Sequence, residues 1–542
     1  MPQRHGLDQG PWPLLLLALA GVLQAASLAW PGLADGAGWG AWLDHGAPQP
    51  WLQWLSMAVM VRVLLWAPSA ARAAAWMAWC ATVAGVATTW WLYISMVHYG
   101  GLLPWAGAAA VVALSAFLAW SFALLGAAFF HVRHRPSAPL WWACGWLLAE
   151  WLRGVVLTGF PWGNIATAHV DGLGVFAPWL GALGVGALAA GLAAWLGTRQ
   201  GLAAVLTAAA VGGVAVAPAM PWHDWDWSQT QATGPARVTL LQGNINQADK
   251  FDAERGVPQA LRWYREAIAA AEPSDLVVAP ETAIPVLPQT LNDDYWRGMA
   301  ETLAAQPAAV AMGVPLGSAQ AGYENALWWM TPSLARAALT QPRIEGQDLA
   351  EQHYAKVHLV PFGEYTPTGF RWFAAALNMP LSGFRAGALD QAPFEWAGQQ
   401  WGVQICYEDV FGAELARRMV LAAPSIWVNV SNIAWFGDTI AVEQHLNIAR
   451  WRARETGRAI VRATNTGATA AIDHLGRVHA RLPAFTRDRL SVDVVGRQAL
   501  TPYVRWVGRW RDAPWVVLAV LPWLWLLGQA WRGRGARGRH LQ

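Results

Sequence analysis

Lysine, cysteine and charged residues in general are scarce in this chain of 542 residues. Charged residues make up only 13% of the chain, against roughly 25% in typical soluble domains, so a uniformly soluble protein is not predicted. The three cysteines are Cys80, Cys144 and Cys406, and the first two lie in apolar segments, so no disulfide framework is predicted. No lysine- or arginine-rich run resembles a nucleic-acid arm and the net charge is only +3, so no nucleic-acid partner is expected.

The scarcity of lysine is the sharpest of these features. Only Lys250 and Lys356 occur among 37 lysines and arginines. A lysine supplies a compact amine with a tunable pKa, which arginine cannot replace. For either lysine alone, an equal alternative is that the residue is a lysine by chance and has no special role. Lys356, however, occurs together with Glu281, which ends an apolar run, and with Cys406, the last cysteine of the chain. A carboxylate, a lysine and a thiol in this order indicate a catalytic set.

Long apolar segments dominate the first 220 residues, and the 39 tryptophans fit a membrane protein. A spanning helix needs about 20 mostly apolar residues. The first segment has weak basic flanking and more segments follow it, so we do not interpret it as a cleavable signal peptide. The predicted spans are residues 12–33, 51–68, 74–97, 103–130, 139–158, 173–196, 202–220 and 513–531.

Basic residues alternate with acidic or neutral loops along these spans, which predicts that both termini lie inside the cell. Seven spans then place residues 221–512 outside. The predicted organisation is a membrane domain at 1–220, a catalytic domain at 221–512, and a last span with a basic cytoplasmic tail at 513–542.

Residues 221–512 alternate between short apolar runs and helical stretches, which favours an α/β sheet covered by helices. Helices are predicted near 253–271, 291–304, 409–421 and 440–456. The predicted strands are 237–244, 275–281, 308–315, 325–330, 401–406, 425–432, 459–463, 469–473 and 490–494.

Cys406 stands at the end of the apolar run Gly-Val-Gln-Ile-Cys. A strand-to-helix turn there would favour a thiolate, and the N–H of Tyr407 would be a natural oxyanion donor. A buried structural cysteine is the alternative. Glu281 could act as general base, or be a loop or capping carboxylate. Lys356 would place a positive charge beside the oxyanion.

Three further residues surround this set in the sequence. Glu364 could position Lys356 or Glu281, or form a salt bridge that holds its loop. Tyr407 and Glu408 flank the thiol and could orient the site or simply pack. His353, His358 and His445 do not have the spacing of metal ligands, so neither a metal nor a cofactor is predicted.

Glu150 and Arg153 form an unusual charged pair inside the fifth predicted span. They are three residues apart and therefore share one helical face. Charges at membrane depth are costly and often functional. An ion pair that only holds helices together is an equal alternative.

Three motifs contain the residues of this set: Pro-Glu-Thr-Ala-Ile-Pro (280–285), Tyr-Ala-Lys-Val-His-Leu-Val-Pro-Phe-Gly-Glu (354–364) and Ile-Cys-Tyr-Glu-Asp (405–409), with supporting stretches at 150–162, 240–247 and 430–437. These motifs resemble the apolipoprotein N-acyltransferase branch of the nitrilase, or carbon–nitrogen hydrolase, superfamily, which has a Glu-Lys-Cys triad. The resemblance implies an α-helical membrane bundle of about eight spans that carries a nitrilase-like αββα sandwich on the periplasmic side of the bacterial inner membrane.

The family's reaction is implied in the same way. The thiol takes a fatty acyl chain from a phospholipid, preferably phosphatidylethanolamine, and the thioester acylates the α-amine of diacylglyceryl-cysteine on an apolipoprotein. The catalytic roles map onto Glu281, Lys356 and Cys406, with Glu364, Tyr407 and Glu408 in support. Phe251 departs from the tryptophan expected in the family. A monomer is expected.

A lipid substrate agrees with the membrane segments, because moving an acyl chain into water costs about 0.8 kcal/mol per CH₂. We expect Phe370–Phe384 and Trp435–Phe436 to act as movable covers that keep water from the thioester. The expected substrate path comprises Phe251, Trp435, Phe436, Glu150 and Arg153. The alternatives are a membrane-tethered amidase that hydrolyses a small amide, an acyltransferase for another acceptor, and a transporter or scaffold.

Overall fold

The computed structural model describes residues 10–32, 44–199, 225–370, 372 and 383–538. Contacts divide the chain into two compact units. We call them the helical unit (1–90, 110–225 and 509–542) and the α/β unit (91–109 and 226–508).

The helical unit contains closely packed helices with small residues at their crossings. A Cβ added to Gly126 would lie 2.5 Å from the Ala73 carbonyl oxygen, and one added to Gly21 would lie 2.8 Å from the Cys80 carbonyl oxygen. Glycine at these two positions lets the helix backbones approach each other, as in membrane bundles. The helices are α1 (Trp12–Leu28), α2 (Pro50–Leu64), α3 (Ala70–Thr89), α6 (Trp120–Phe130), α7 (Ala138–Val155), η2 (Ile165–His169), η3 (Leu173–Phe176), α8 (Ala177–Thr198) and α17 (Ala513–Gly538).

Within the part of the chain that the structure describes, three helical stretches are long and apolar enough to cross a membrane: Ala70–Thr89, Pro104–Phe130 and Leu173–Thr198. Trp12–Leu28 and Ala513–Leu526 are apolar but shorter. The seventh predicted span, 202–220, lies outside the described residues. The count of eight spans therefore stays a prediction.

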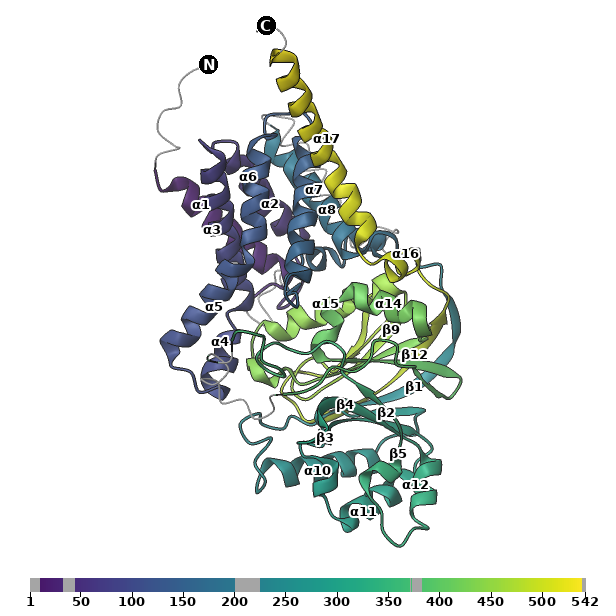
Figure 1. The fold of residues 1–542 in the computed structure, drawn as a ribbon. Coiled ribbons are helices and arrows are strands. Elements are labelled where there is room, and N and C mark those ends of the chain that lie inside the picture. Colours follow the sequence, from purple (N-terminus) through teal and green to yellow (C-terminus); the bar gives the residue numbers. More distant parts are fainter. Residues whose placement is uncertain (1–9, 33–43, 200–224, 371, 373–382, 539–542) are drawn as a thin grey trace. The chain divides into compact units, whose positions relative to one another are not determined.

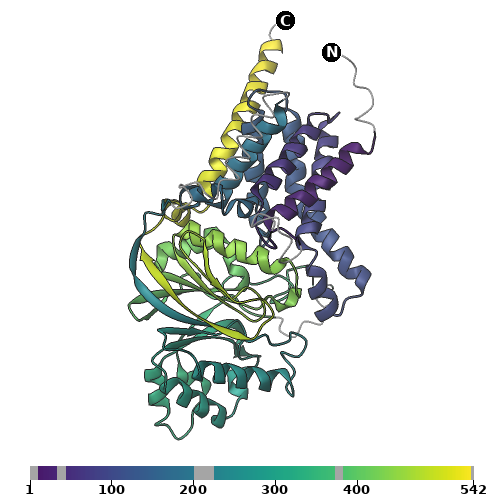
Figure 2. The same ribbon diagram turned by 180° about the vertical axis from the view of Figure 1, so that it is seen from behind.

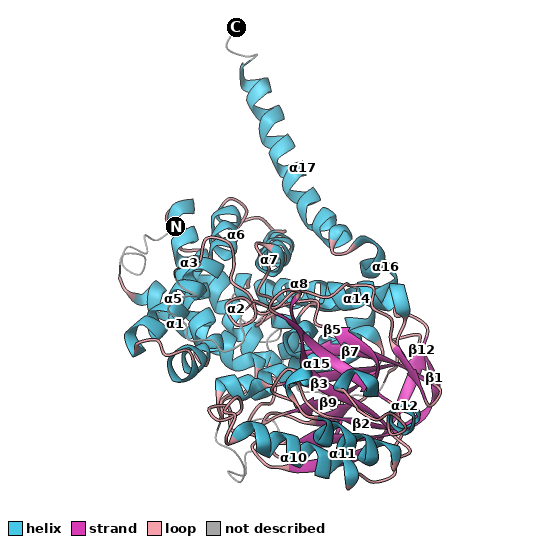
Figure 3. Cartoon of the chain, turned by 60° about the horizontal axis from the view of Figure 1, so that its bottom comes forward, coloured by secondary structure: helices cyan, strands magenta, loops and turns pink. Residues whose placement is uncertain are grey.

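The α/β unit contains two six-stranded sheets, shown in magenta in Figure 3. The first has the order β12-β1-β2-β3-β4-β5 and the second β11-β10-β9-β8-β7-β6. Within them β1, β2 and β3 run parallel, as do β7, β8 and β9. The first sheet consists of β1 (Gln231–Gln242), β2 (Leu276–Val278), β3 (Ala309–Ser318), β4 (Gly322–Met330), β5 (Ala350–Ala355) and β12 (Asp488–Gln498). The second consists of β6 (Phe394–Trp396), β7 (Gln399–Ile405), β8 (Ile426–Ser431), β9 (Ala459–Thr464), β10 (Ala470–Ile472) and β11 (Val478–Arg481).

Helices cover the outer faces of both sheets within this unit (Figure 1; Figure 2). On the first sheet lie α10 (Gly256–Ala269), α11 (Asp293–Ala304) and α12 (Pro332–Ala338), and on the second α14 (Gly412–Ala422) and α15 (Ala441–Thr456). Shorter elements are η5 (Pro288–Thr290), η6 (Gly346–Leu349), η7 (Cys406–Val410), η8 (Ile433–Phe436) and α16 (Pro502–Trp510).

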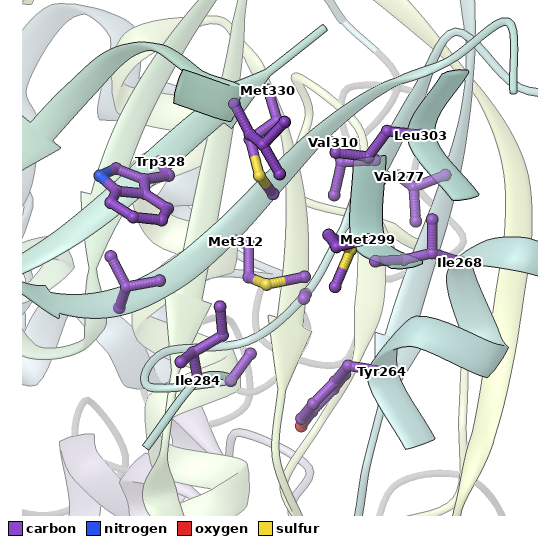
Figure 4. Close-up of a cluster of buried hydrophobic side chains, with 14 of the residues drawn as sticks. Tyr264, Ile268, Val277, Ile284, Met299, Leu303, Val310, Met312, Trp328 and Met330 are labelled. Carbon is purple, nitrogen blue, oxygen red and sulfur yellow. The ribbon is translucent and has the colours of Figure 1, made fainter. Parts of the chain in front are cut away.

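Two hydrophobic cores hold these layers together. One lies between the sheets and joins strands such as β3 and β8 through Ala311 and Val428. The other lies under α10 and α11, where Ile268 and Met299 pack towards Met312 on β3 (Figure 4). Burying such a side chain stabilises the fold by roughly 1.5–3 kcal/mol. The unit is thus a sandwich of two sheets with helices on its outer faces, as the resemblance implies.

The predicted strands are present with shifted ends, but β5, β6, β11 and the helices α12 and α16 were not predicted. β5 has the sequence Ala-Glu-Gln-His-Tyr-Ala and lies at the edge of its sheet, with its middle residues exposed. An edge strand needs no continuous apolar run, so periodicity misses it.

The segment 91–109 belongs to the α/β unit, although the sequence assigned 91–97 to the third span. The fourth predicted span, 103–130, agrees with the long apolar stretch Pro104–Phe130. It contains α4 (Leu92–Ile94), the π-helical turn η1 (Ser95–Tyr99) and the start of α5 (Pro104–Leu118). Trp91 Nε1 donates to Gln444 Oε1 at 3.2 Å, and its ring lies 4.3 Å from that of Phe436. The helix of the predicted span 74–97 therefore ends at Thr89, and the segment that follows packs on η8 and α15.

Candidate active site

Cys406 occupies a strained turn directly after β7. Its φ of +52° lies in the left-handed region, which costs a non-glycine residue on the order of 1–3 kcal/mol. The strand before it agrees with the prediction. The helix predicted near 409–421 is α14, but it begins only at Gly412, and the single 3₁₀ turn η7 separates it from Cys406. The thiol thus stands at a 3₁₀ turn and not directly at the N-terminus of α14.

Two glutamates and a lysine meet beside the thiol. Lys356, which is 1% exposed, lies with its Nζ 2.9 Å from Glu364 Oε1 and 3.6 Å from Glu281 Oε1. Glu281 follows β2, and Cys406 follows β7 in the other sheet. The Cys406 thiol interacts electrostatically with Glu281, Lys356 and Glu364. The fold therefore gathers the three predicted catalytic residues and one supporting residue in one cluster.

The electrostatics keep the thiol protonated at rest. Burial and the Glu281 charge raise the pKa of Cys406 to about 12, although Lys356 and the Ser431 hydroxyl act in the opposite direction. Burial alone would lower the pKa of Lys356, but the charges of Glu364 and Glu281 outweigh it and raise that pKa. Lys356 is thus a permanent cation, and the thiol needs a base before it can attack.

Two asparagines that the sequence did not indicate fix the carboxylates. Asn325 Nδ2 donates to Glu281 Oε1 and to Glu364 Oε1, each at 2.7 Å. The backbone N–H of Asn432 donates to Glu281 Oε2 at 2.8 Å. Glu364 Oε2 also accepts from the Val360 N–H at 2.7 Å, which closes its own loop. Glu281 and Glu364 therefore have fixed orientations around Lys356.

Glu408 ties the lysine loop to the nucleophile strand. Its Oε1 accepts from Tyr354 Oη at 2.8 Å and from the Val357 N–H at 2.6 Å, while Oε2 accepts from the Ile405 N–H at 2.6 Å. The side chain of Tyr407 packs edge-on to Phe411, with ring centroids 5.1 Å apart. Glu408 is therefore a structural clamp between the two halves of the site.

A buried polar network lies behind the turn of Cys406. Asp409 accepts from His445 Nε2 and from Arg462, each at 2.9 Å, and Arg462 also reaches His445 Nδ1 at 2.6 Å. His445 additionally bonds to the backbone of Cys406. Burial and Arg462 lower the pKa of His445, so it supports the turn as a neutral ring. Among the described residues no group of His, Cys, Asp and Glu could hold a metal ion.

The predicted aromatic path residues gather near η8. The ring of Phe251 stacks on Trp435 at 6.4 Å, and Tyr99 meets Trp435 edge-on at 5.6 Å. Most of the predicted cover Phe370–Phe384 lies outside the described residues. Its last residue, Phe384, donates its N–H to the Glu364 carbonyl oxygen at 2.9 Å.

Glu150 and Arg153 lie on α7 in the helical unit, with Arg153 Nη2 3.6 Å from Glu150 Oε1. Glu150 also accepts from Asn164 Nδ2 at 2.7 Å and from the Ile165 N–H at 3.1 Å. The pair therefore ties α7 to the following loop and η2.

The carbon–nitrogen hydrolase family model matches residues 237–501, so the α/β unit contains a carbon–nitrogen hydrolase domain, with which its fold agrees. The model of the apolipoprotein N-acyltransferase N-terminal domain matches residues 40–195.

Curated relatives extend this match to nearly the whole chain. An apolipoprotein N-acyltransferase of Verminephrobacter eiseniae is 43% identical and covers 98% of both chains. Those of Ralstonia nicotianae and Bordetella bronchiseptica are 40% and 38% identical, over 84% and 91% of this chain and 85% and 95% of theirs. The chain belongs to the apolipoprotein N-acyltransferase family.

Proposed function

We propose that this protein transfers a fatty acyl chain from a membrane phospholipid, through a thioester on Cys406, to the N-terminal amine of diacylglyceryl-cysteine on an apolipoprotein. The observation that carries the proposal is the cluster of Glu281, Lys356 and Cys406 on a strained turn, in a chain that also has the family's helical unit. A free amidase would not need that unit, and the family membership does not favour it.

In the first half-reaction Glu281 takes the proton of the Cys406 thiol. The sulfur attacks the ester carbonyl of the phospholipid, and Lys356 with the Tyr407 N–H stabilises the oxyanion. The C–O bond then breaks, the thioester forms, and protonated Glu281 returns its proton to the lysophospholipid oxygen.

In the second half-reaction the acceptor amine attacks the thioester carbonyl. Glu281 accepts a proton from the amine. The C–S bond breaks, an amide forms, and Glu281 passes its proton to the departing thiolate. The chain therefore ends each cycle in its starting protonation state, and no cofactor is required.

Transfer without hydrolysis requires that water be kept from the thioester. The aromatic group formed by Phe251, Trp435 and Tyr99 supports a role as the wall of the acyl path. Trp435→Ala should shorten the life of the thioester in the absence of acceptor, which intact mass measured over time would reveal. An unchanged lifetime would remove Trp435 from the cover.

The proposal also covers the oligomeric state of the protein, its place in the membrane and its lipid donor. We propose a monomer with about eight spans in the bacterial inner membrane, the α/β unit on the periplasmic side and phosphatidylethanolamine as the preferred donor. The alternation of basic and acidic loops and the three long apolar helices support this arrangement.

The test is intact-mass measurement after incubation of the detergent-solubilised protein with phosphatidylethanolamine, with Cys406→Ala in parallel. A fatty-acyl increment that hydroxylamine removes, absent from the variant, is expected. A diacylglyceryl-cysteine peptide should then discharge it and gain the acyl chain. Absence of any adduct, with release of free fatty acid, would favour a hydrolase.

A further inference from the structure

The second lysine of the chain, Lys250, also lies in the site, and the mechanism above gives it no task. It sits in the loop between β1 and α10, and its side chain is 1% exposed. Lys250 Nζ donates to the backbone carbonyl oxygen of Glu281 at 3.2 Å. Both lysines that this arginine-rich chain contains therefore contact the same glutamate.

The loop of Lys250 is attached to the residues that hold Glu281. Asn432, whose N–H binds the Glu281 carboxylate, donates its Nδ2 to Gln247 Oε1 at 2.8 Å. Asn465 Oδ1 accepts from the Ile245 N–H at 3.0 Å. A buried ammonium held this firmly is costly unless an opposite charge compensates it. The Glu281 carboxylate supplies that charge.

The charges near Glu281 explain why a second cation is useful there. The ionisable groups that face it are Lys356, Glu364 and the Cys406 thiol, in addition to Lys250. Two carboxylates that share one lysine repel each other. Lys250 brings the cluster to two cations against two carboxylates.

We propose that Lys250 is a positioning residue for the base: its ammonium holds the Glu281 backbone at the turn before Thr282 and places a second positive charge beside the carboxylate that accepts the thiol proton. Thr282 has a φ of +54°, so the backbone at this turn needs such a tether. The inference rests on the proposed function for the role of Glu281 as base.

Three substitutions separate the two parts of this role. Lys250→Arg keeps a cation and a donor, Lys250→Gln keeps a donor without charge, and Lys250→Met keeps neither. The matched control is Arg255→Met, which removes an exposed cation from the same loop. Melting temperatures in detergent identify any variant that fails to fold, and Lys250→Gln replaces Lys250→Met if the latter does.

The expected result is a pH-dependent loss of single-turnover thioester formation from phosphatidylethanolamine. At pH 6, Lys250→Gln and Lys250→Met should be slower than wild type by about tenfold, the loss of one charge-assisted hydrogen bond to the Glu281 backbone. Burial lowers the pKa of Lys250 to about 8, despite the opposing charge of Glu281. Above pH 8 the Lys250 ammonium of the wild type therefore loses its charge. The pH–rate profiles of the wild type and of Lys250→Gln should then converge. Lys250→Arg should restore the rate at pH 6.

A loss that is equal at every pH, or a Lys250→Arg variant as slow as Lys250→Met, would mean that Lys250 only packs, and would overturn the inference. The same comparison with p-nitrophenyl acetate, a soluble ester, separates the two proposals. Wild type that releases nitrophenolate with the expected Lys250 dependence, yet forms no lipid thioester, would overturn the acyltransferase proposal alone. Wild type that reacts with neither ester would overturn both.

Discussion

Glu150 in the helical unit and Glu281 in the α/β unit have nearly the same partners. Each carboxylate accepts an asparagine Nδ2 at 2.7 Å, each accepts a backbone N–H, and each lies 3.6 Å from a cation. Glu150 is 3% exposed and Glu281 is 7% exposed. Burial, charge pairing and hydrogen bonding alone therefore do not distinguish a candidate base from a structural carboxylate.

The two carboxylates differ in the kind of cation beside them and in the groups that surround this cation. The cation beside Glu150 is an arginine one helical turn away on the same helix. The cation beside Glu281 is a lysine shared with a second carboxylate and coupled to a thiol. Arginine is always charged and forms a rigid fork, whereas a lysine amine is a compact charge that fits beside a developing oxyanion. The groups around each carboxylate–cation pair, and not the pair itself, therefore distinguish a candidate base from a structural carboxylate.

The largest effect is expected from Glu281→Gln. Gln keeps the size of the side chain but cannot take the thiol proton, and general-base catalysis is worth about 10²–10⁴-fold. The rate of thioester formation should fall by that order, and the melting temperature should fall as well, because Gln weakens the bonds to Asn325 and Asn432. A loss of less than about tenfold would show that the thiol loses its proton by another route.

Lys356→Arg should reduce the same rate by about a hundredfold, because a displaced charge no longer stabilises the oxyanion. Arg153→Lys is the matching change in the other pair, and it should alter stability by less than about 1 kcal/mol. Single-turnover rates and melting curves of both variants test the contrast. Equal rates for Lys356→Arg and wild type would mean that only the sign of the charge matters.

Asn325→Ala should slow thioester formation by roughly tenfold to a hundredfold, since hydrogen bonds to charged groups are worth about 1.5–3 kcal/mol. The variant frees both Glu281 and Glu364. The corresponding Asn164→Ala frees only Glu150, so melting temperature is the informative measurement. If Asn325→Ala lost stability but no rate, the asparagine would have a structural role only.

Glu150→Gln should lower the free energy of unfolding by about 1–3 kcal/mol through weakened bonds to Asn164 and Ile165. Thermal unfolding in detergent measures this loss. A variant as stable as wild type would show that the pair does not hold α7 to its loop.

The sequence predicted the site well where its residues follow apolar strands. Glu281 and Cys406 could be found because they end the runs of β2 and β7. Asn325 and Asn432 could not, since an amide in or after a strand has no charge or spacing that marks it. Their roles arise from the pairing of distant strands. The second carboxylate, Glu364, was recognised, but its shared asparagine was not.

The same limit explains the segment 91–109. Its hydropathy continues that of the third predicted span, so the pattern gives no reason to end the span at Thr89. Contacts with η8 and α15, far along the chain, decide where it belongs. Local periodicity does not contain this information.

The place of Trp91 in the α/β unit also sets an order of events during biosynthesis. Trp91 and its hydrogen-bond partner Gln444 are separated by 353 residues. At about 5–20 residues per second the ribosome needs roughly 20–70 s to reach the partner after making Trp91. During that interval the segment has left the ribosome without its final neighbours. The α/β unit can therefore reach its complete form only late in translation, when its earliest piece meets one of its last helices.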